Sequence, residues 1–130
     1  MEKPKKSIKD IIYRKEWLSD WLSTATYGNP WFAFGTHKDT PDDVYDLAKR
    51  FGECREDIWA YVLLHGGTLL VEDVEEEEDH AVTMKDVEKG FLIFMLNCPT
   101  QYAALMDETA DIYDADALMQ CIVFGEVVYG

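Results

Sequence analysis

The side chains best able to do chemistry in this chain are carboxylates, and they are concentrated in one segment. Residues 72–79 read "EDVEEEED", with seven acids in eight positions. Four consecutive Glu followed by Asp cannot lie inside a core, because each unpaired buried charge would cost several kcal/mol. We therefore expect an exposed segment. It is either a hairpin loop or mobile segment kept soluble by its charge, or a contact surface for a cationic partner.

Two other acidic stretches, residues 39–46 and 107–116, could join this segment in one continuous negative band. Carboxylates spaced like phosphates can occupy the groove in which a basic protein binds DNA or RNA. Their mutual repulsion costs free energy, and proteins seldom carry that cost without solubility, halophily or a cationic partner as the reason. A basic N-terminus and a pI near 4.4 argue against halophily. The candidate partner-binding residues are Glu72, Asp73, Glu75, Glu76, Glu77, Glu78, Asp79, Asp111, Asp114 and Asp116.

An aromatic stripe is the second local signal. Tyr13, Trp17 and Trp21 are spaced at i, i+4 and i+8, so they share one face of a predicted helix. One interpretation is burial against the rest of the domain, for example against Trp31 and Phe32. The other is a partner-facing patch, because Trp and Tyr are favoured interface anchors.

Nucleophilic catalysis has little support in the sequence. Ser7, Ser19 and Ser23 all fall on the predicted first helix, and there is no G-x-S-x-G motif. Cys54 and His65 share a predicted helix, but eleven residues of helix separate them by about 16 Å, too far for a catalytic pair. No catalytic residue is predicted.

The sequence also gives little support for a metal site or a nucleotide site. The three histidines, His37, His65 and His80, have neither HxxxH spacing nor a zinc-binding pattern with Cys. The stretch 107–116 lacks the glycine and the alternating rhythm of an EF-hand, so we expect a solvated turn with Asp114 capping the last helix. "HGGT" runs from helix into strand and lacks the lysine of a P-loop. No metal and no cofactor are predicted.

The overall charge favours basic protein partners. The net charge is −14, but the first 16 residues hold six bases against three acids, so they carry +3 and the other 114 residues carry −17. After Lys89 there is no Lys or Arg. Such a field repels phosphate backbones and anionic lipid, so we expect no direct binding of nucleic acid or membrane.

Cysteine usage and hydropathy favour a cytoplasmic protein. The chain has an odd number of cysteines and no CxxC motif, which suits reduced thiols better than a disulfide framework. The three are Cys54, Cys98 and Cys121. The charged N-terminal segment has no signal-peptide apolar region. The longest apolar run, "FLIFML", is six residues long and too short to span a bilayer.

The hydrophobic periodicity of the chain and its helix start and stop signals predict a single α+β domain over residues 1–130. It is mostly helical, with about five helices and a small β-sheet or hairpin. The last helix is apolar nearly all round, so it lies in the core or in a dimer interface. Gly125 inside it suggests close backbone packing. The expected helices are 7–26, 41–51, 54–65, 83–97, a short one near 100–108 and 114–128; the expected strands are "WFAFG" and "TLLVEDV".

Three C-terminal segments carry a resemblance. "GGTLLVEDVEE", "TMKDVEKGF" and "DADALMQCIVFGEVVYG" resemble small, acidic, uncharacterised proteins encoded on conjugative elements and phages of gut Firmicutes. The likeness covers about residues 58–130 and brings no assigned activity, so no functional residue is carried over. It implies a context, because accessory genes of mobile elements often encode small acidic proteins that block restriction or CRISPR nucleases.

The leading hypothesis from the sequence is a non-enzymatic, cytoplasmic interaction protein of a mobile element. It would bind a basic protein surface and inhibit a host DNA- or RNA-binding factor as a nucleic-acid mimic. The alternative is a structural or regulatory subunit that forms a homodimer or larger homo-oligomer through the apolar last helix and the aromatic stripe. A small metal-dependent enzyme is the third hypothesis.

Overall fold

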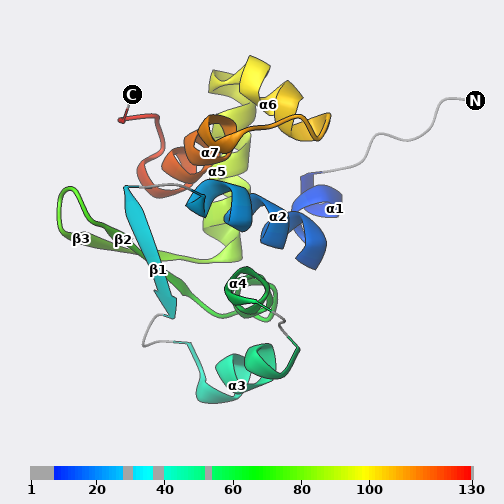
Figure 1. Cartoon of the computed structure of the whole chain (residues 1–130), viewed down its shortest axis with the longest axis vertical. Helices are drawn as coiled ribbons and strands as arrows, with labels where there is room; N and C mark the ends of the chain where they lie inside the picture. The colour runs from blue at the N-terminus through cyan, green and yellow to red at the C-terminus, as the bar shows by residue number, and fades with distance from the viewer. Residues whose placement is uncertain (1–7, 28–30, 37–39, 52–53, 130) are drawn as a thin grey trace, which may run out of the picture.

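The computed structural model describes residues 8–27, 31–36, 40–51 and 54–129, which form a mostly helical α+β domain (Figure 1). The fold class predicted from the sequence is confirmed. His37, Asp39 and the basic first seven residues lie outside the described ranges. The elements are α1 (Ile8–Ile12), α2 (Lys15–Thr26), β1 (Phe32–Thr36), α3 (Asp42–Phe51), α4 (Arg55–Leu64), β2 (Leu69–Asp73), β3 (Glu78–Val82), α5 (Met84–Asn97), α6 (Pro99–Met106) and α7 (Ile112–Phe124).

The three strands form an antiparallel sheet in the order β1-β2-β3. Val71 pairs with Phe34 on one side and with His80 on the other, which fixes the register of all three strands. Leu69, Val71 and Val82 are buried on the inner face. Helices α5 and α7 contact β3, and α4 contacts β2, so the helices cover this inner face.

Helices α5 and α7 form the centre of the core, and a glycine sets their separation. A Cβ atom at Gly90 would lie 2.4 Å from the Cα of Ile122, so only glycine fits where the two backbones meet. The sequence placed such a contact at Gly125, and this was wrong. Gly125 ends α7 with a φ of 75°, a left-handed conformation that glycine adopts readily.

The N-terminal segment is two helices, so the prediction of one helix over 7–26 was wrong. Arg14 between α1 and α2 is extended, with φ −133° and ψ 129°. The break lets the two helices pack in different places, because α1 contacts α5 whereas α2 contacts α4 and α7. Ile12 and Leu18, on either side of it, are both completely buried.

Helix α7 is the core helix of the molecule. Its buried side chains are Ala115, Ala117, Leu118, Met119, Gln120, Cys121 and Ile122. Of the two places predicted for this helix, core or dimer interface, it occupies the core. It runs from Ile112 to Phe124, earlier than the predicted 114–128, and the residues after it turn back along the molecule (Figure 1).

Candidate functional site

The acidic segment 72–79 forms the end of a β-hairpin. Glu72 and Asp73 end β2, residues 74–77 form the turn, and Glu78 begins β3. Glu72 pairs across the strands with Asp79, so these side chains are direct neighbours on one face of the sheet. Glu77 adopts a left-handed backbone conformation in the turn, with a φ of 55°. The segment is thus an ordered hairpin, and β3, which was not predicted, is its second strand.

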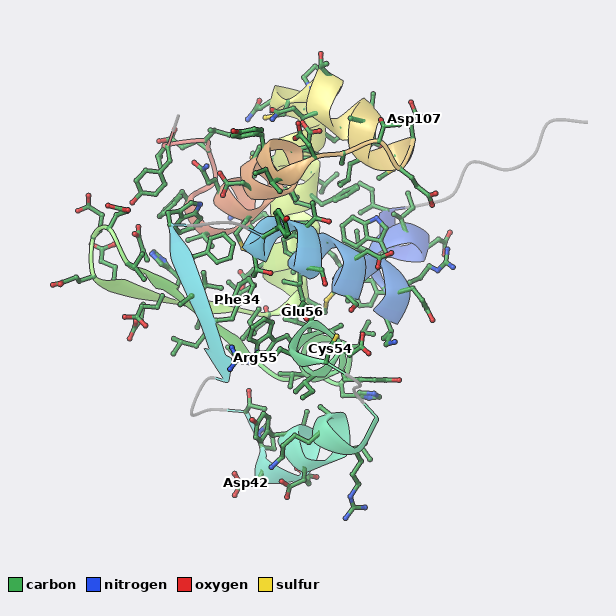
Figure 2. All side chains as sticks on the ribbon, in the orientation of Figure 1. Phe34, Asp42, Cys54, Arg55, Glu56 and Asp107 are labelled. Atoms are coloured by element: carbon green, nitrogen blue, oxygen red, sulfur yellow. The ribbon has the colours of Figure 1, made fainter. Side chains whose placement is uncertain are left out.

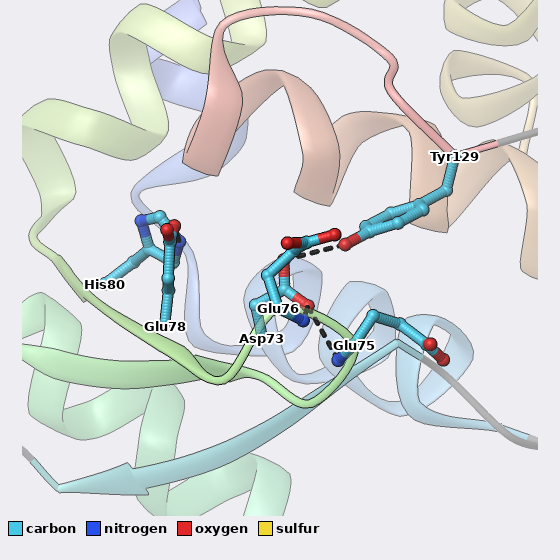
Figure 3. A network of polar contacts seen from close by, with 6 residues as sticks. All are labelled: Asp73, Glu75, Glu76, Glu78, His80 and Tyr129. Carbon is cyan, nitrogen blue, oxygen red and sulfur yellow. Dashed lines mark hydrogen bonds and ion pairs between the residues drawn. The ribbon is translucent and has the colours of Figure 1, made fainter.

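Asp73 anchors this hairpin from inside (Figure 3). It is 1% exposed. Its Oδ1 accepts the backbone N–H groups of Glu75 at 2.9 Å and Glu76 at 3.1 Å, and its Oδ2 accepts the hydroxyl of Tyr129 at 2.8 Å. Three donors satisfy the carboxylate, which is why it can be buried. Asp73, predicted as a partner contact on an exposed run, is therefore a structural residue.

The ionisation of Asp73 and Tyr129 fits this arrangement. Desolvation raises the pKa of Asp73, but the hydrogen bonds from Tyr129, Glu76 and Glu75 outweigh it, so the pKa lies below its ordinary value. Burial, together with the hydrogen bond to Asp73, raises the pKa of Tyr129 to about 12. At neutral pH the hydroxyl is therefore the donor and the carboxylate the acceptor.

The remaining acids of the hairpin are all exposed: Glu72, Glu75, Glu76, Glu77, Glu78 and Asp79. His80 lies beside them, with its Nε2 3.9 Å from Glu78 Oε2 and its ring edge-to-face with Phe124. This Nε2 is buried and has no hydrogen-bond partner among the described residues. Within the described ranges no group of three or more His, Cys, Asp or Glu side chains is arranged to hold a metal ion. What the hairpin can do is attract and contact cationic groups.

The C-terminal residues tie the hairpin to α7. Gln120 is 1% exposed, and its Oε1 accepts the backbone N–H groups of Val128 and Tyr129, both at 2.8 Å. Its Nε2 donates to Asp116 Oδ2 at 2.8 Å. Asp116 Oδ1 accepts the indole N–H of Trp31 at 2.5 Å. Asp116, another predicted partner contact, therefore has two internal partners.

Asp111 and Asp114 are also used within the fold. Asp111 is the N-cap of α7, and its Oδ1 accepts the N–H groups of Tyr113 and Asp114, each at 3.0 Å. Asp114 Oδ2 accepts the N–H of Asp111 at 3.0 Å, which completes a capping box. The predicted cap at Asp114 was three residues late, because the helix begins at the earlier aspartate.

The three acidic stretches are spread over different parts of the molecule. Figure 2 places Asp42 and Asp107 at opposite ends, and the acidic hairpin projects from a third side (Figure 1). Asp116 lies closer to the hairpin, because the indole of Trp31 donates to Asp116 and the backbone carbonyl of Trp31 accepts the N–H of Val74. One continuous band over all three stretches stays a prediction.

Two members of the predicted aromatic stripe pack inward. Trp21 is 3% exposed, and its Nε1 donates to the carbonyl of Ala115 at 3.1 Å. Trp17 is half-buried. Its ring stacks on Trp21 with centroids 6.0 Å apart, and it meets Phe91 edge-to-face at 5.6 Å. Burial against the domain is correct for Trp21.

Tyr13 differs from these two, since it is 40% exposed and donates a hydrogen bond to Glu88. Trp31 and Phe32, named as packing partners of the stripe, contact each other and belong to the same buried core cluster as Trp21. The three aromatic side chains therefore do not form one exposed patch.

A polar cluster that the sequence did not reveal joins α2 to α4. Ser19 Oγ donates to Asp57 Oδ1 at 2.6 Å, and Lys15 Nζ lies 3.3 Å from the same oxygen. The hydrogen bond to Asp57 raises the pKa of Lys15, so this amine stays protonated and is no general base. The cluster has a structural role. The sequence offered no signal for it, because Ser19 and Asp57 are far apart in the chain.

The three cysteines differ in burial. Cys54 is exposed, Cys98 is half-buried and Cys121 is buried, and all three are free thiols. Burial raises the pKa of Cys121 to about 12, which keeps it a thiol and a poor nucleophile.

Comparisons with known proteins add no assignment. No family model, no curated protein and no solved structure matches this chain. Within the described ranges, no helix has both the length and the apolar character needed to cross a membrane. The acidic hairpin and its buried anchor, Asp73, form the candidate functional site.

Proposed function

We propose that this chain is a non-enzymatic interaction protein whose acidic hairpin binds a basic protein surface. The observation that supports this is the anchoring of the turn by Asp73, which presents six exposed carboxylates from ordered backbone. Charges held in place before binding lose less conformational entropy on association. Their combined field also accelerates encounter with a cationic partner.

The partner class is a DNA- or RNA-binding factor of the host, which the hairpin would block by taking the place of the phosphate backbone. The net charge of −14 keeps the chain itself away from nucleic acid and anionic membranes. Three free thiols suit the cytoplasm. The resemblance to acidic proteins of mobile elements supports the same context.

The test is a pull-down from a host lysate at about 0.05 M and about 0.5 M salt, where the screening length differs about threefold. We expect a basic nucleic-acid-binding protein to be captured at low salt only. Added DNA or RNA should compete with the chain for this protein. The variant with Glu75–Glu78→Gln should lose the capture, because it removes four of the six exposed hairpin charges.

A matched control removes four exposed acids elsewhere, in a variant with Glu16→Gln, Asp42→Asn, Asp107→Asn and Glu126→Gln. It has the same net charge as the hairpin variant and should keep the capture. Equal loss in both variants would mean that total charge, and no particular surface, attracts the partner. Capture that survives high salt would reject charge mimicry.

The second candidate function is a homo-oligomeric subunit, and one observation favours it. Leu92 and Leu96 lie one turn apart on α5 and are 43% and 74% exposed. Exposed leucines at this spacing suit a helix-to-helix contact between two copies. Sedimentation of the unmodified chain and of the Leu92→Glu, Leu96→Glu variant tests it. A dimer that becomes a monomer in the variant would support it, and a monomer in both would reject it.

A further inference from the structure

A groove is lined by residues of α2, α6 and the connection from α6 to α7. These segments lie away from the acidic hairpin (Figure 1). The main hollow of the groove has a volume of about 280 Å³, with Trp17, Trp21 and Leu105 among its apolar walls and Asp20 and Glu108 among its acids. A second hollow of about 220 Å³ shares Trp17, Leu105 and Glu108 with the first. We call the two hollows together the aromatic–acidic groove.

The walls of the main hollow leave only certain groups for a ligand. The indole N–H of Trp21 is bonded to the carbonyl of Ala115 and the residue is 3% exposed, so Trp21 forms part of the wall and offers no free donor. The hydroxyl of Thr24 is bonded to the backbone carbonyl of Asp20. Polar recognition therefore falls to the carboxylates of Asp20 and Glu108, which are exposed and have no hydrogen-bond or ion-pair partner among the described residues.

The charge of the main hollow is negative throughout. Among the residues that the structure describes, its lining includes these two carboxylates and no basic side chain. Arg14 lines only the second hollow, where Asp10 accompanies it. A cation that enters the main hollow thus meets two carboxylates and the half-buried indole ring of Trp17, which is backed by Trp21 at an interplanar angle of 25°.

We propose that the aromatic–acidic groove binds an arginine side chain of a partner protein. A guanidinium group is planar, so it stacks on an indole face and still donates its N–H groups to carboxylates at its edge. The volume of the main hollow, about 280 Å³, lies just below the range of about 300–1,000 Å³ typical of sites for drug-sized ligands. The main hollow therefore suits one side chain better than a larger cofactor.

The two proposed sites use different residues and can fail independently. The hairpin acts through long-range charge, whereas the groove recognises one cation by shape and stacking. A partner with a basic surface could engage both, but arginine binding in the groove does not depend on the hairpin.

The probe is N-acetylarginine amide, titrated into the isotope-labelled chain and followed by nuclear magnetic resonance. We expect saturable shifts of the indole resonances of Trp17 and Trp21 and of the backbone amide of Leu105. The citrulline amide has nearly the same shape without charge and should bind at least about tenfold more weakly. The lysine amide should also bind more weakly, because an ammonium group cannot stack as a plane.

Two variants separate the groove from general charge. Asp20→Asn with Glu108→Gln should weaken arginine binding about tenfold, since it removes both carboxylates that face the cation. Asp42→Asn with Glu126→Gln removes the same charge from exposed positions outside the groove and the hairpin, and should leave binding unchanged. Equal loss in the two variants, equal binding of citrulline or lysine, or no saturable shift at these indoles would each overturn the proposal.

Discussion

The acidic stretches 72–79 and 107–116 are similar in composition but use their carboxylates in different ways. In the second stretch, Asp111, Asp114 and Asp116 all accept hydrogen bonds that begin α7 or hold neighbouring side chains. In the first, Asp73 alone does so among the described residues, and six others are exposed. An acid becomes structural where unpaired donors lie within reach, and it stays available to a partner where they do not. Substitutions that separate the two kinds of acid test this comparison.

The largest effect is expected at Asp73. Asp73→Ala should lower the free energy of unfolding by about 3 kcal/mol, because the Tyr129 hydroxyl and two turn N–H groups lose a charged acceptor. Urea denaturation measures this. The neighbouring exposed acid is the control, since Glu72→Ala should cost less than about 0.5 kcal/mol. Similar losses in both variants would mean that the buried anchor has no special role.

The pH dependence of stability provides a second measurement on Asp73. Because its pKa in the fold lies below the ordinary value of 3.8, the ionised form stabilises the fold above that pH. This contribution is lost as the pH falls through the lower pKa of the folded state. The difference in unfolding free energy between the unmodified chain and Asp73→Asn should therefore shrink in acid. A difference that does not change with pH would contradict the assignment.

Asp116 should show the next largest effect. Asp116→Ala removes the acceptor for the indole N–H of Trp31 and for the buried amide of Gln120, so we expect a loss of about 2 kcal/mol. Thermal unfolding by circular dichroism measures the change. Asp116→Asn keeps one carbonyl oxygen and should recover part of the loss. If both variants unfold like the unmodified chain, these hydrogen bonds add no net stability.

The cap at Asp111 should contribute less. Asp111→Ala leaves the N–H groups of Tyr113 and Asp114 without a side-chain acceptor and should cost about 1 kcal/mol. Asp111→Ser retains an oxygen at the cap and should lower the unfolding free energy by only a few tenths of about 1 kcal/mol. Urea denaturation of the two variants decides the matter, and an equal loss in both would mean that the charge and not the cap is important.

The smallest effect is expected in the exposed hairpin acids. The variant Glu75–Glu78→Gln should raise the unfolding free energy by less than about 0.5 kcal/mol, since repulsion between neighbours is relieved. The same denaturation measurement applies. A loss of more than about 1 kcal/mol would show that these side chains are structural, and the contrast between the two acidic stretches would disappear.

Local signals in the sequence predicted several elements well. Thr83 and Asp86 form a capping box at the start of α5, which runs from Met84 to Asn97, close to the predicted 83–97. Acids in the first turn and bases in the last mark α3, which spans Asp42–Phe51, close to the predicted 41–51. Such signals depend on residues within one turn of each other, so they can be read without the fold.

The elements that failed depend on distant contacts. Strand β3 begins with Glu78 and Asp79, which disfavour strands, and it forms through its pairing with β2. The break at Arg14 has no Gly or Pro to announce it and follows from the separate packing of α1 and α2. The glycine contact was misplaced for the same reason, because only the fold brings Gly90 to Ile122.

The candidate site shows the same division. A run of charge is enough to predict that Glu75–Glu78 are exposed. The burial of Asp73 could not be predicted, because its side-chain donor, Tyr129, is 56 residues away in the chain. The groove beside Trp17 was equally hidden, since Glu108 comes to it from a distant segment.

Strand β3 is an outer strand of the sheet, and this position gives its acids a further consequence. An outer strand can template the addition of a strand from another molecule, which is one route to aggregation. Exposed Glu78 and Asp79 place negative charge along this edge, so at neutral pH two copies repel each other there. Near the pI of 4.4 this protection weakens, and concentrated samples should then self-associate edge to edge.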